Sequence, residues 1–198
     1  MPDQKRPYRM QRRAELEEAT RRRITESAAE LHGTVGPSRT SISAVAERAG
    51  VRRSTVYRHF PDEPALFAAC SAHWMAANPR PDLDRWAAIE DPDERLRSSL
   101  EELYAYYRRT EGMLSNLLRD EATMPTVRRR FQGFHDYLTA ARDTLVAGRT
   151  RARPRRRLQA SIGLAVAFTT WRSLAREQEL DDDDAADLMC RLVAAAAL

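Results

Sequence analysis

The side chains best suited to binding chemistry lie in one short stretch: Arg52, Arg53, Ser54, Thr55, Tyr57, Arg58 and His59. An arginine fork can donate two parallel hydrogen bonds to guanine, and a threonine can contact a base or a thymine methyl group. Tyr57 and His59 carry O–H and N–H groups that can donate to phosphate oxygens, and Arg58 either contacts phosphate or lies in solvent. This set predicts a surface that contacts base edges and backbone of duplex DNA.

Two short helices joined by a tight turn would position these side chains. Residues 42–49 place apolar side chains at the spacing of one buried helix face, and the hydroxyl of Thr40 or Ser41 can cap that helix. Gly50 supplies the turn, where a positive φ would strain other residues. A third helix is expected over about 53–60. This layout is a helix-turn-helix, which places its second helix in the DNA major groove.

The rest of the chain is also helical in pattern. No segment has the alternation of a strand, so we predict an all-α fold of about nine helices. A DNA-binding domain over residues 1–61 would precede a helical ligand-binding and dimerisation domain over 62–198. Besides a loose arm over 1–11, the expected helices are 12–32, 62–77, 83–89, 91–110, 113–121, 125–146, 155–176 and 182–198, with a basic linker over 148–157.

Positive charge is concentrated at the N-terminal end. Residues 1–60 hold 13 basic and 7 acidic residues, a balance of +6, whereas residues 61–198 hold 20 basic and 22 acidic residues, a balance of −2. This distribution fits neutralisation of DNA phosphates beside the predicted helix-turn-helix. Since 32 of the 33 basic residues are arginine, a bias that we attribute partly to a GC-rich genome, the arginine count alone is weak evidence.

Cysteine usage and hydropathy argue against several other classes. Cys70 and Cys190 lie 120 residues apart and neither belongs to a CxxC pair, so we expect no disulfide framework and no zinc site. No apolar run reaches the ~18 residues of a membrane span, and the basic start lacks the apolar segment of a signal peptide. We therefore expect a cytoplasmic protein without a cofactor or a membrane partner.

An enzyme is the main rival class. Residues 181–184 are four aspartates that could bind magnesium in an all-helical synthase, but carboxylates at a helix start complement the helix dipole and no second acidic cluster has a matching spacing. The chain also lacks the Glu-x-x-His pattern of di-iron bundles and the GxSxG, P-loop and HExxH motifs. We expect neither enzymatic activity nor a metal site.

The run GVRRSTVYRHFPDEPALF (residues 50–67), with ISAVAERA before it, resembles the N-terminal module of the TetR family of bacterial repressors. The likeness is close from about Ile24 to Ala69, and the later run YAYYRRTEGMLSNLLRD is similar, less specifically, to the helical sensor domains of the family. The resemblance implies an all-helical homodimer whose first three helices bind a palindromic operator. The last two helices would form a four-helix dimer interface, and ligand binding in between would release the DNA.

The resemblance also assigns roles to single residues. Thr40 would contact phosphate, Arg53, Ser54 and Thr55 would face bases, and Tyr57 and His59 would hold the backbone. Two positions depart from the family pattern. Arg52 stands where a serine cap is common, and Glu63 stands where a lysine commonly grips phosphate. A carboxylate repels phosphate, so these departures put DNA affinity in question unless Arg52 or Arg58 compensates.

A ligand pocket should be lined by apolar and aromatic side chains with a few polar groups. Each apolar candidate also fits a plain core position, and Asp120 and His135 also fit a solvated carboxylate and a core histidine. An apolar or aromatic small molecule of unknown identity is the expected ligand. The candidates at suitable helical spacing are Trp74, Leu103, Tyr107, Met113, Leu117, Asp120, Phe131, Phe134, His135 and Trp171.

Dimer contacts are expected in the last two helices, and burial in the monomer core is the alternative use of the same residues. Two further functions fit the sequence: an architectural DNA-binding protein without a ligand, and a ligand-dependent activator. Operator position relative to the promoter decides between activation and repression. The dimer candidates are Leu164, Ala165, Phe168, Trp171, Leu188, Leu192 and the alanines 194–197.

Overall fold

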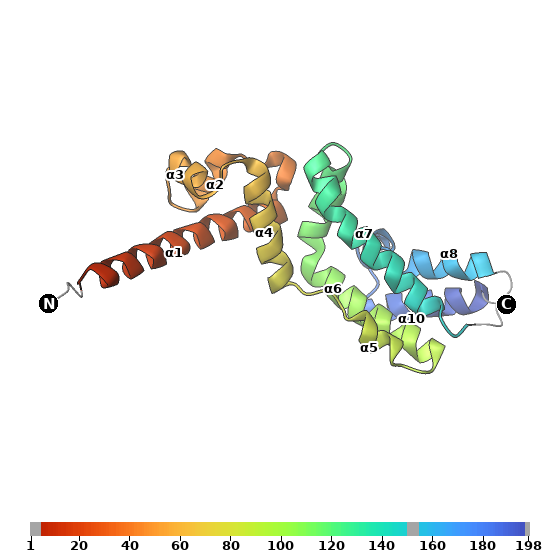
Figure 1. Ribbon diagram of the computed structural model, residues 1–198. Helices are drawn as coiled ribbons and strands as arrows, with labels where there is room; N and C mark the ends of the chain where they lie inside the picture. Colours follow the sequence, from red (N-terminus) through yellow and green to blue (C-terminus); the bar gives the residue numbers. More distant parts are fainter. Residues whose placement is uncertain (1–4, 150–154, 197–198) are drawn as a thin grey trace. The chain divides into compact units, whose positions relative to one another are not determined.

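The computed structural model describes residues 5–149 and 155–196, and these residues form ten α-helices and no strand. The predicted all-α fold is therefore confirmed (Figure 1). The helices are α1 (Lys5–Thr34), α2 (Ile42–Arg48), α3 (Arg53–His59), α4 (Glu63–Ala77), α5 (Leu83–Ala87), α6 (Pro92–Glu121), α7 (Pro125–Val146), α8 (Arg155–Ala165), α9 (Phe168–Arg172) and α10 (Asp182–Ala196), with a 3₁₀ turn at Pro37–Arg39 and a π-helical turn at Ser173–Glu177.

The chain divides into two compact units. The N-terminal unit comprises residues 1–79 and 115–126, and the C-terminal unit comprises residues 80–114 and 127–198. The N-terminal unit thus contains α1 to α4 together with the last turns of α6. The predicted boundary between residues 61 and 62 separates a DNA-binding domain from a ligand-binding and dimerisation domain. This boundary is defined by function, and it stays a prediction.

Local capping defines the helices around the turn of the N-terminal unit. The Ser41 hydroxyl accepts a hydrogen bond from the Ala44 amide at 3.1 Å, and the Asp62 carboxylate accepts one from the Ala65 amide at 2.7 Å. Each side chain satisfies an amide that has no partner within its helix. Gly50 between α2 and α3 has φ 64°. The predicted hydroxyl cap of α2 and the predicted turn at Gly50 are confirmed, with Ser41 as the capping residue.

Two helix starts were predicted wrongly. The arm is helical from Lys5 onward, because Pro7 falls in the first turn, where amide protons have no intrahelical partner. Residues 1–4 lie outside the described residues. Leu16 is 63% exposed because this part of α1 extends past α2 and α3 (Figure 1). Gly112 does not break the chain into two helices, and α6 continues to Glu121.

The expected helix over 155–176 is interrupted after Ala165, where Ala167 has an extended backbone with ψ 132°. The interruption leaves carbonyl groups without helical partners in a buried place. The Tyr104 hydroxyl donates to the Ala165 carbonyl at 2.8 Å, and the Tyr107 hydroxyl donates to the Val166 carbonyl at 2.5 Å. Both tyrosines are fully buried, and these two bonds compensate for the interrupted helix.

Two glycine substitutions should have opposite effects on stability. A Cβ at Gly50 or at Gly133 would meet no atom within 4 Å, but only Gly50 has a positive φ. Gly50→Ala is expected to lower the free energy of unfolding by about 1 kcal/mol because of left-handed strain. Gly133→Ala, inside α7, is expected to raise it by up to about 1 kcal/mol. Urea denaturation of both variants measures the difference, and equal effects would contradict the conformational explanation.

Candidate nucleic-acid interface

The short helix α3 is anchored by two apolar side chains and presents polar ones. Val56 is fully buried and Phe60, at its C-terminal end, is 1% exposed. The guanidinium of Arg21 from α1 lies 4.3 Å from the centre of the Phe60 ring and donates to the His59 carbonyl at 2.6 Å. This carbonyl belongs to the last turn of α3, so Arg21 fixes that end of the helix against α1.

The solvent side of α3 carries the predicted contact residues. Arg52, Arg53, Ser54, Tyr57 and Arg58 are exposed, and Thr55 is half-buried. Because Val56 holds the helix by its opposite side, these side chains are presented together on one rigid element. The structure thus brings together the predicted residues of this segment. Arg52 caps α3 without a side-chain hydrogen bond, which matches the missing serine.

Arg53 and Tyr57 interact with each other on α3. The Arg53 guanidinium donates to the Tyr57 hydroxyl at 3.3 Å and lies 5.6 Å from the centre of the ring. Residues four apart meet on one helix face, and a guanidinium over an aromatic ring is weakly attracted to it. The pair restricts the long arginine side chain on the solvent side of α3.

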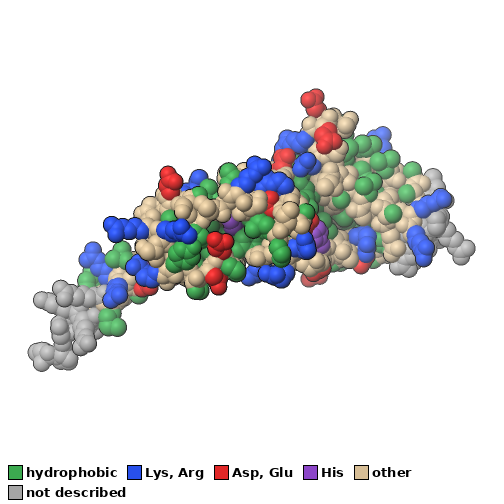
Figure 2. All heavy atoms as spheres, turned by 90° about the horizontal axis from the view of Figure 1, so that it is seen from above, with side chains coloured by type: hydrophobic (Ala, Val, Ile, Leu, Met, Phe, Trp, Pro, Cys, Tyr) green, Lys and Arg blue, Asp and Glu red, His purple; other side chains and the backbone are tan. Residues whose placement is uncertain are grey.

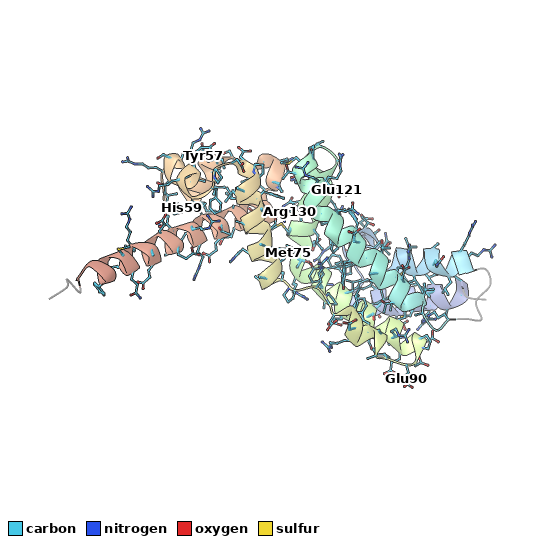
Figure 3. All side chains as sticks on the ribbon, viewed as in Figure 1. Tyr57, His59, Met75, Glu90, Glu121 and Arg130 are labelled. Carbon is cyan, nitrogen blue, oxygen red and sulfur yellow. The ribbon has the colours of Figure 1, made fainter. Side chains whose placement is uncertain are left out.

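Tyr57 and His59 lie differently at the end of α3 (Figure 3). Tyr57 is 39% exposed, whereas His59 is half-buried and its Nε2 atom is buried with no hydrogen-bond partner among the described residues. Donation from His59 to a phosphate would therefore use Nδ1 or require the ring to turn.

Thr40 lies just before α2 and is half-buried. Its hydroxyl donates to the Gly36 carbonyl at 2.8 Å, and its oxygen can still accept a hydrogen bond. Glu63, in the first turn of α4, is exposed. Figure 2 shows Lys and Arg side chains at several places on the surface of the N-terminal helices, next to fewer acidic ones. This surface is suited to phosphate contacts, with Glu63 as an opposing charge.

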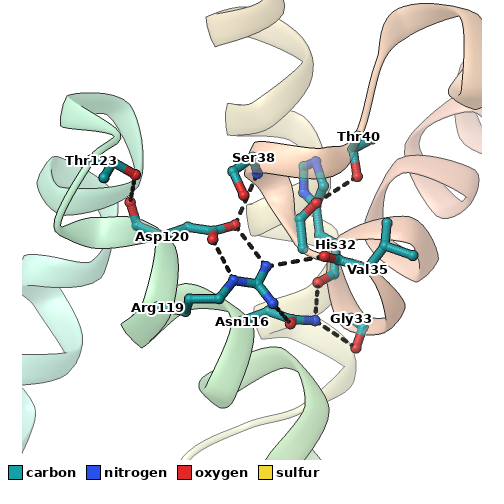
Figure 4. A network of polar contacts seen from close by, with 10 residues as sticks. His32, Gly33, Val35, Ser38, Thr40, Asn116, Arg119, Asp120 and Thr123 are labelled. Atoms are coloured by element: carbon teal, nitrogen blue, oxygen red, sulfur yellow. Dashed lines mark hydrogen bonds and ion pairs between the residues drawn. The ribbon is translucent and has the colours of Figure 1, made fainter.

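The last turn of α6 holds the loop that precedes α2 through a polar network (Figure 4). Asn116 donates to the carbonyls of His32 and Gly33 at 2.9 and 3.0 Å, and Arg119 donates to the Val35 carbonyl at 3.0 Å. The Asp120 carboxylate accepts from the Ser38 amide at 2.9 Å. These bonds join residues more than 80 positions apart and fix the segment from which Thr40 and Ser41 emerge.

Two further features, the bonds of the Asp120 carboxylate and the close approach of Gly36 to Arg119, stabilise this network. The carboxylate of Asp120 also accepts from Arg119 Nε at 2.8 Å, and Asp120 is only 2% exposed. Burial acts to raise the pKa of Asp120, but the hydrogen bonds from Arg119 and Ser38 outweigh it and the pKa is lowered. Gly36 has φ 95°, and a Cβ there would lie 2.0 Å from Arg119 Nη2. A glycine is therefore required where the loop meets the arginine.

Asp120→Asn tests this network. An amide keeps one acceptor but also places a donor where the carboxylate accepted, so Ser38 or Arg119 loses a charge-assisted bond. We expect the free energy of unfolding at pH 7 to fall by about 1 to 2 kcal/mol. Asp136→Asn, on an exposed part of α7, is the matched control and should change stability by less than about 0.5 kcal/mol. Equal stability of the two variants in urea denaturation would contradict a structural role for Asp120.

The predicted ligand contacts divide between the two units. Trp74, Leu117 and Asp120 belong to the N-terminal unit, and the other candidates belong to the C-terminal unit. Within the C-terminal unit, rings cluster around the fully buried Tyr107: the ring centre of Phe134 lies at 6.5 Å and that of Trp171 at 5.9 Å. Phe131 stacks on Phe134 at 5.0 Å and meets His135 edge-on at 5.0 Å. Leu103 is fully buried, and Met113 is 7% exposed.

Sequence reasoning missed Arg21, Asn116 and Arg119. Asn116, Arg119 and Asp120 share the i, i+3, i+4 spacing of one helix face, which was the available signal. Their partners are backbone groups of a distant loop, and no sequence pattern identifies such partners. In the part of the chain that the structure describes, no three His, Cys, Asp or Glu side chains are placed to hold a metal ion. None of the described helices is long and apolar enough to cross a membrane.

Residues 24–70 match the family model of the bacterial regulatory proteins of the tetR family, and this segment covers the end of α1, α2, the turn, α3 and the first half of α4. This segment of the chain therefore belongs to the TetR family. The family assignment made from the residues around Gly50 is thus confirmed. No curated relative matches the sequence.

Solved structures of TetR-like proteins share the fold at low sequence identity. A putative fatty acid metabolism regulator of Clostridium perfringens has a TM-score of 0.65 at 15% identity, with 89% of this chain and 98% of that chain covered. NalD of Pseudomonas aeruginosa, the secondary repressor of the MexAB-OprM multidrug efflux pump, has a TM-score of 0.63 at 22% identity, covering 93% and 98%. A tetR-family regulator of Streptomyces coelicolor has a TM-score of 0.61 at 19% identity, covering 90% and 80%. The TetR fold therefore extends over both units.

Proposed function

We propose that this TetR-family protein is a homodimeric repressor that leaves a palindromic operator when a small, apolar or aromatic ligand binds. The single observation that carries DNA binding is the polar side of α3, which is anchored from behind by Val56 and presents Arg53, Ser54 and Tyr57 to solvent. We assign DNA binding to residues 1–61, and ligand binding and dimerisation to residues 62–198. Such a regulator acts in the cytoplasm, where bacterial DNA lies.

The proposed contact residues fall into two groups, one that reaches base edges and one that reaches phosphates. Arg53, Ser54 and Thr55 occupy the first turn of α3, the part of a recognition helix that meets base edges. Contacts to phosphates come from residues at the edges of the surface, and these are Thr40, Arg52, Tyr57, Arg58 and His59.

Selection of binding sites from random duplex DNA at physiological salt tests this function. A dimeric repressor should enrich a palindrome whose half-sites are one helical turn apart, about 34–36 Å. Enrichment of a single half-site would contradict the dimer, and weak salt-sensitive binding without enrichment would favour an architectural protein. A promoter reporter with the selected palindrome separates a repressor from an activator by the sign of its response.

We place the dimer interface on α8 and α10. Leu164, Leu188 and Leu192 are 56%, 37% and 49% exposed in the protomer. Exposed large apolar side chains that share neighbouring helices favour an interface with another chain. Ala165, Phe168 and Trp171, also predicted for the interface, are buried within the protomer. Of the alanines, Ala197 lies outside the described residues.

Leu192→Glu should weaken this dimer. A carboxylate at the centre of an apolar interface loses its hydration, and we expect the dimer dissociation constant to rise at least about 10-fold. Met75→Glu, at an apolar residue of α4 that is 48% exposed, is the matched control and should leave the dissociation constant unchanged. Analytical ultracentrifugation distinguishes the two, and equal behaviour of both variants would remove α10 from the interface.

We place the effector among the rings around Tyr107 in the C-terminal unit. Aromatic walls suit an apolar or aromatic molecule, and the hydroxyl oxygens of Tyr104 and Tyr107, whose protons bond the Ala165 and Val166 carbonyls, can still accept a hydrogen bond from a polar group on it. A ligand that prefers the protein conformation with mismatched recognition helices shifts the population away from DNA. The test is whether such compounds release the protein from the selected operator. If the effector binds among these rings, Tyr107→Phe or Trp171→Leu should abolish this release.

A further inference from the structure

A cavity in the N-terminal unit is separate from the aromatic rings of the C-terminal unit. It has a volume of about 190 Å³ and is bounded by the end of α1, the 3₁₀ turn, the starts of α2 and α4, and the turn after α6. Its apolar wall includes Val45, Leu66, Phe67 and Met124, and its polar groups include His32 and Glu63. For comparison, an apolar cavity of about 150 Å³ in another protein holds one benzene molecule.

The hydrogen bonds around His32 determine what its ring can offer to a ligand. The Cys70 thiol donates its proton to the Phe67 carbonyl at 3.3 Å, and its sulfur lies 3.4 Å from His32 Nδ1. The thiol has one proton, and while it bonds the Phe67 carbonyl the contact with His32 is satisfied by a proton on Nδ1 that donates to sulfur. In the neutral ring Nε2 is then a bare acceptor. Burial lowers the pKa of His32 to about 4, so the ring is neutral at pH 7.

The remaining groups of the cavity favour the same kind of ligand. Glu63 also lines the cavity and is exposed, and its carboxylate oxygens accept hydrogen bonds. The ring centres of His32 and Phe67 lie 5.3 Å apart, so two ring systems meet at the wall. A flat apolar body with a hydrogen-bond donor therefore suits the two rings, the Nε2 lone pair and the carboxylate, while the hydroxyl groups of Thr40, Ser41 and Thr126 in the same lining can donate or accept.

We propose that this cavity is a second small-molecule site, which binds a single aromatic ring bearing one hydrogen-bond donor, such as a phenol. The ring would lie against Val45, Leu66, Phe67 and Met124, and its hydroxyl would donate to His32 Nε2. The site is in the unit that carries α3 and is independent of the effector site proposed above.

Methyl NMR of the full-length protein, without DNA, tests the proposal with phenol as the probe. Phenol should cause saturable shifts at the methyl groups of Val45, Leu66 and Met124, with a dissociation constant on the order of 1 mM for a ligand of this size. Toluene has nearly the same shape but no donor, and it should bind at least about 3-fold more weakly. Because no DNA is present, the outcome does not depend on whether the protein binds an operator.

Two valine variants test whether phenol binds in this cavity. Val45→Phe places a ring inside the cavity and should abolish the phenol-induced shifts, with folding checked by circular dichroism. Val35→Phe makes the same substitution at a side chain that is 39% exposed and does not line the cavity, and should leave phenol binding intact. The absence of saturable shifts at the three wild-type methyl sites would overturn the proposal even if Val45→Phe does not fold. Toluene binding as tight as phenol would also overturn it.

Discussion

Lowering the pH from 7 to 5 is expected to reduce the free energy of unfolding by about 2 kcal/mol through His32 alone. Burial lowers the pKa of His32 to about 4 and nearby Asp120 partly opposes this, whereas the unfolded chain binds the proton below about 6.5. Between these values the unfolded state holds more protons, so stability falls as the pH falls. The loss is complete near pH 4, at on the order of 3 kcal/mol.

Urea denaturation at pH 7 and pH 5 measures this loss in the wild type and in His32→Gln, which cannot titrate. The variant should be less stable at pH 7, since it disturbs the contact with Cys70, but its stability should change little between the two pH values. His73→Gln, at an exposed histidine of α4, is the control and should keep the wild-type pH dependence. A pH dependence that survives in His32→Gln would assign the effect to other groups.

Replacing Arg53 by alanine is expected to weaken binding to the selected operator about 10- to 100-fold and to relax the preference at one base position. A bidentate arginine contributes about 1–3 kcal/mol of discrimination between bases, and the first turn of α3 is where such a contact is made. The comparison requires affinities for the operator and for single-base variants at a stated salt concentration.

The variants Tyr57→Phe and Tyr57→Ala separate the contribution of the Tyr57 hydroxyl group from that of its ring. Losing the hydroxyl removes the bond from Arg53 and any bond to phosphate, so affinity should fall for all sequences together while base preference stays. Arg39→Ala, at an exposed arginine just before α2, gives the effect of removing one charge outside α3. Wild-type operator affinity in both Arg53→Ala and Tyr57→Ala would mean that α3 is not the recognition helix.

The residues around Gly50 were predictable because short-range rules decide them. The cap at Ser41, the positive φ of Gly50, and the buried Val56 and Phe60 each follow from the position of a residue within its own few turns of chain. The start of α1 also follows a local rule, because a proline is tolerated in a first turn. The interruption after Ala165 was not predictable in this way, because it depends on hydroxyl groups from α6.

The all-α class, the TetR-like N-terminal module and the residues that α3 presents could be predicted from the sequence, because helix periodicity, capping and a short motif are local properties of the chain. The partners of the predicted polar residues became known only from the tertiary structure. Asp120, expected to meet a ligand, accepts from Ser38 and Arg119, and the His32 ring lies between Cys70 and the cavity. The reason is physical: a buried polar group must find partners, and those partners lie far away in sequence.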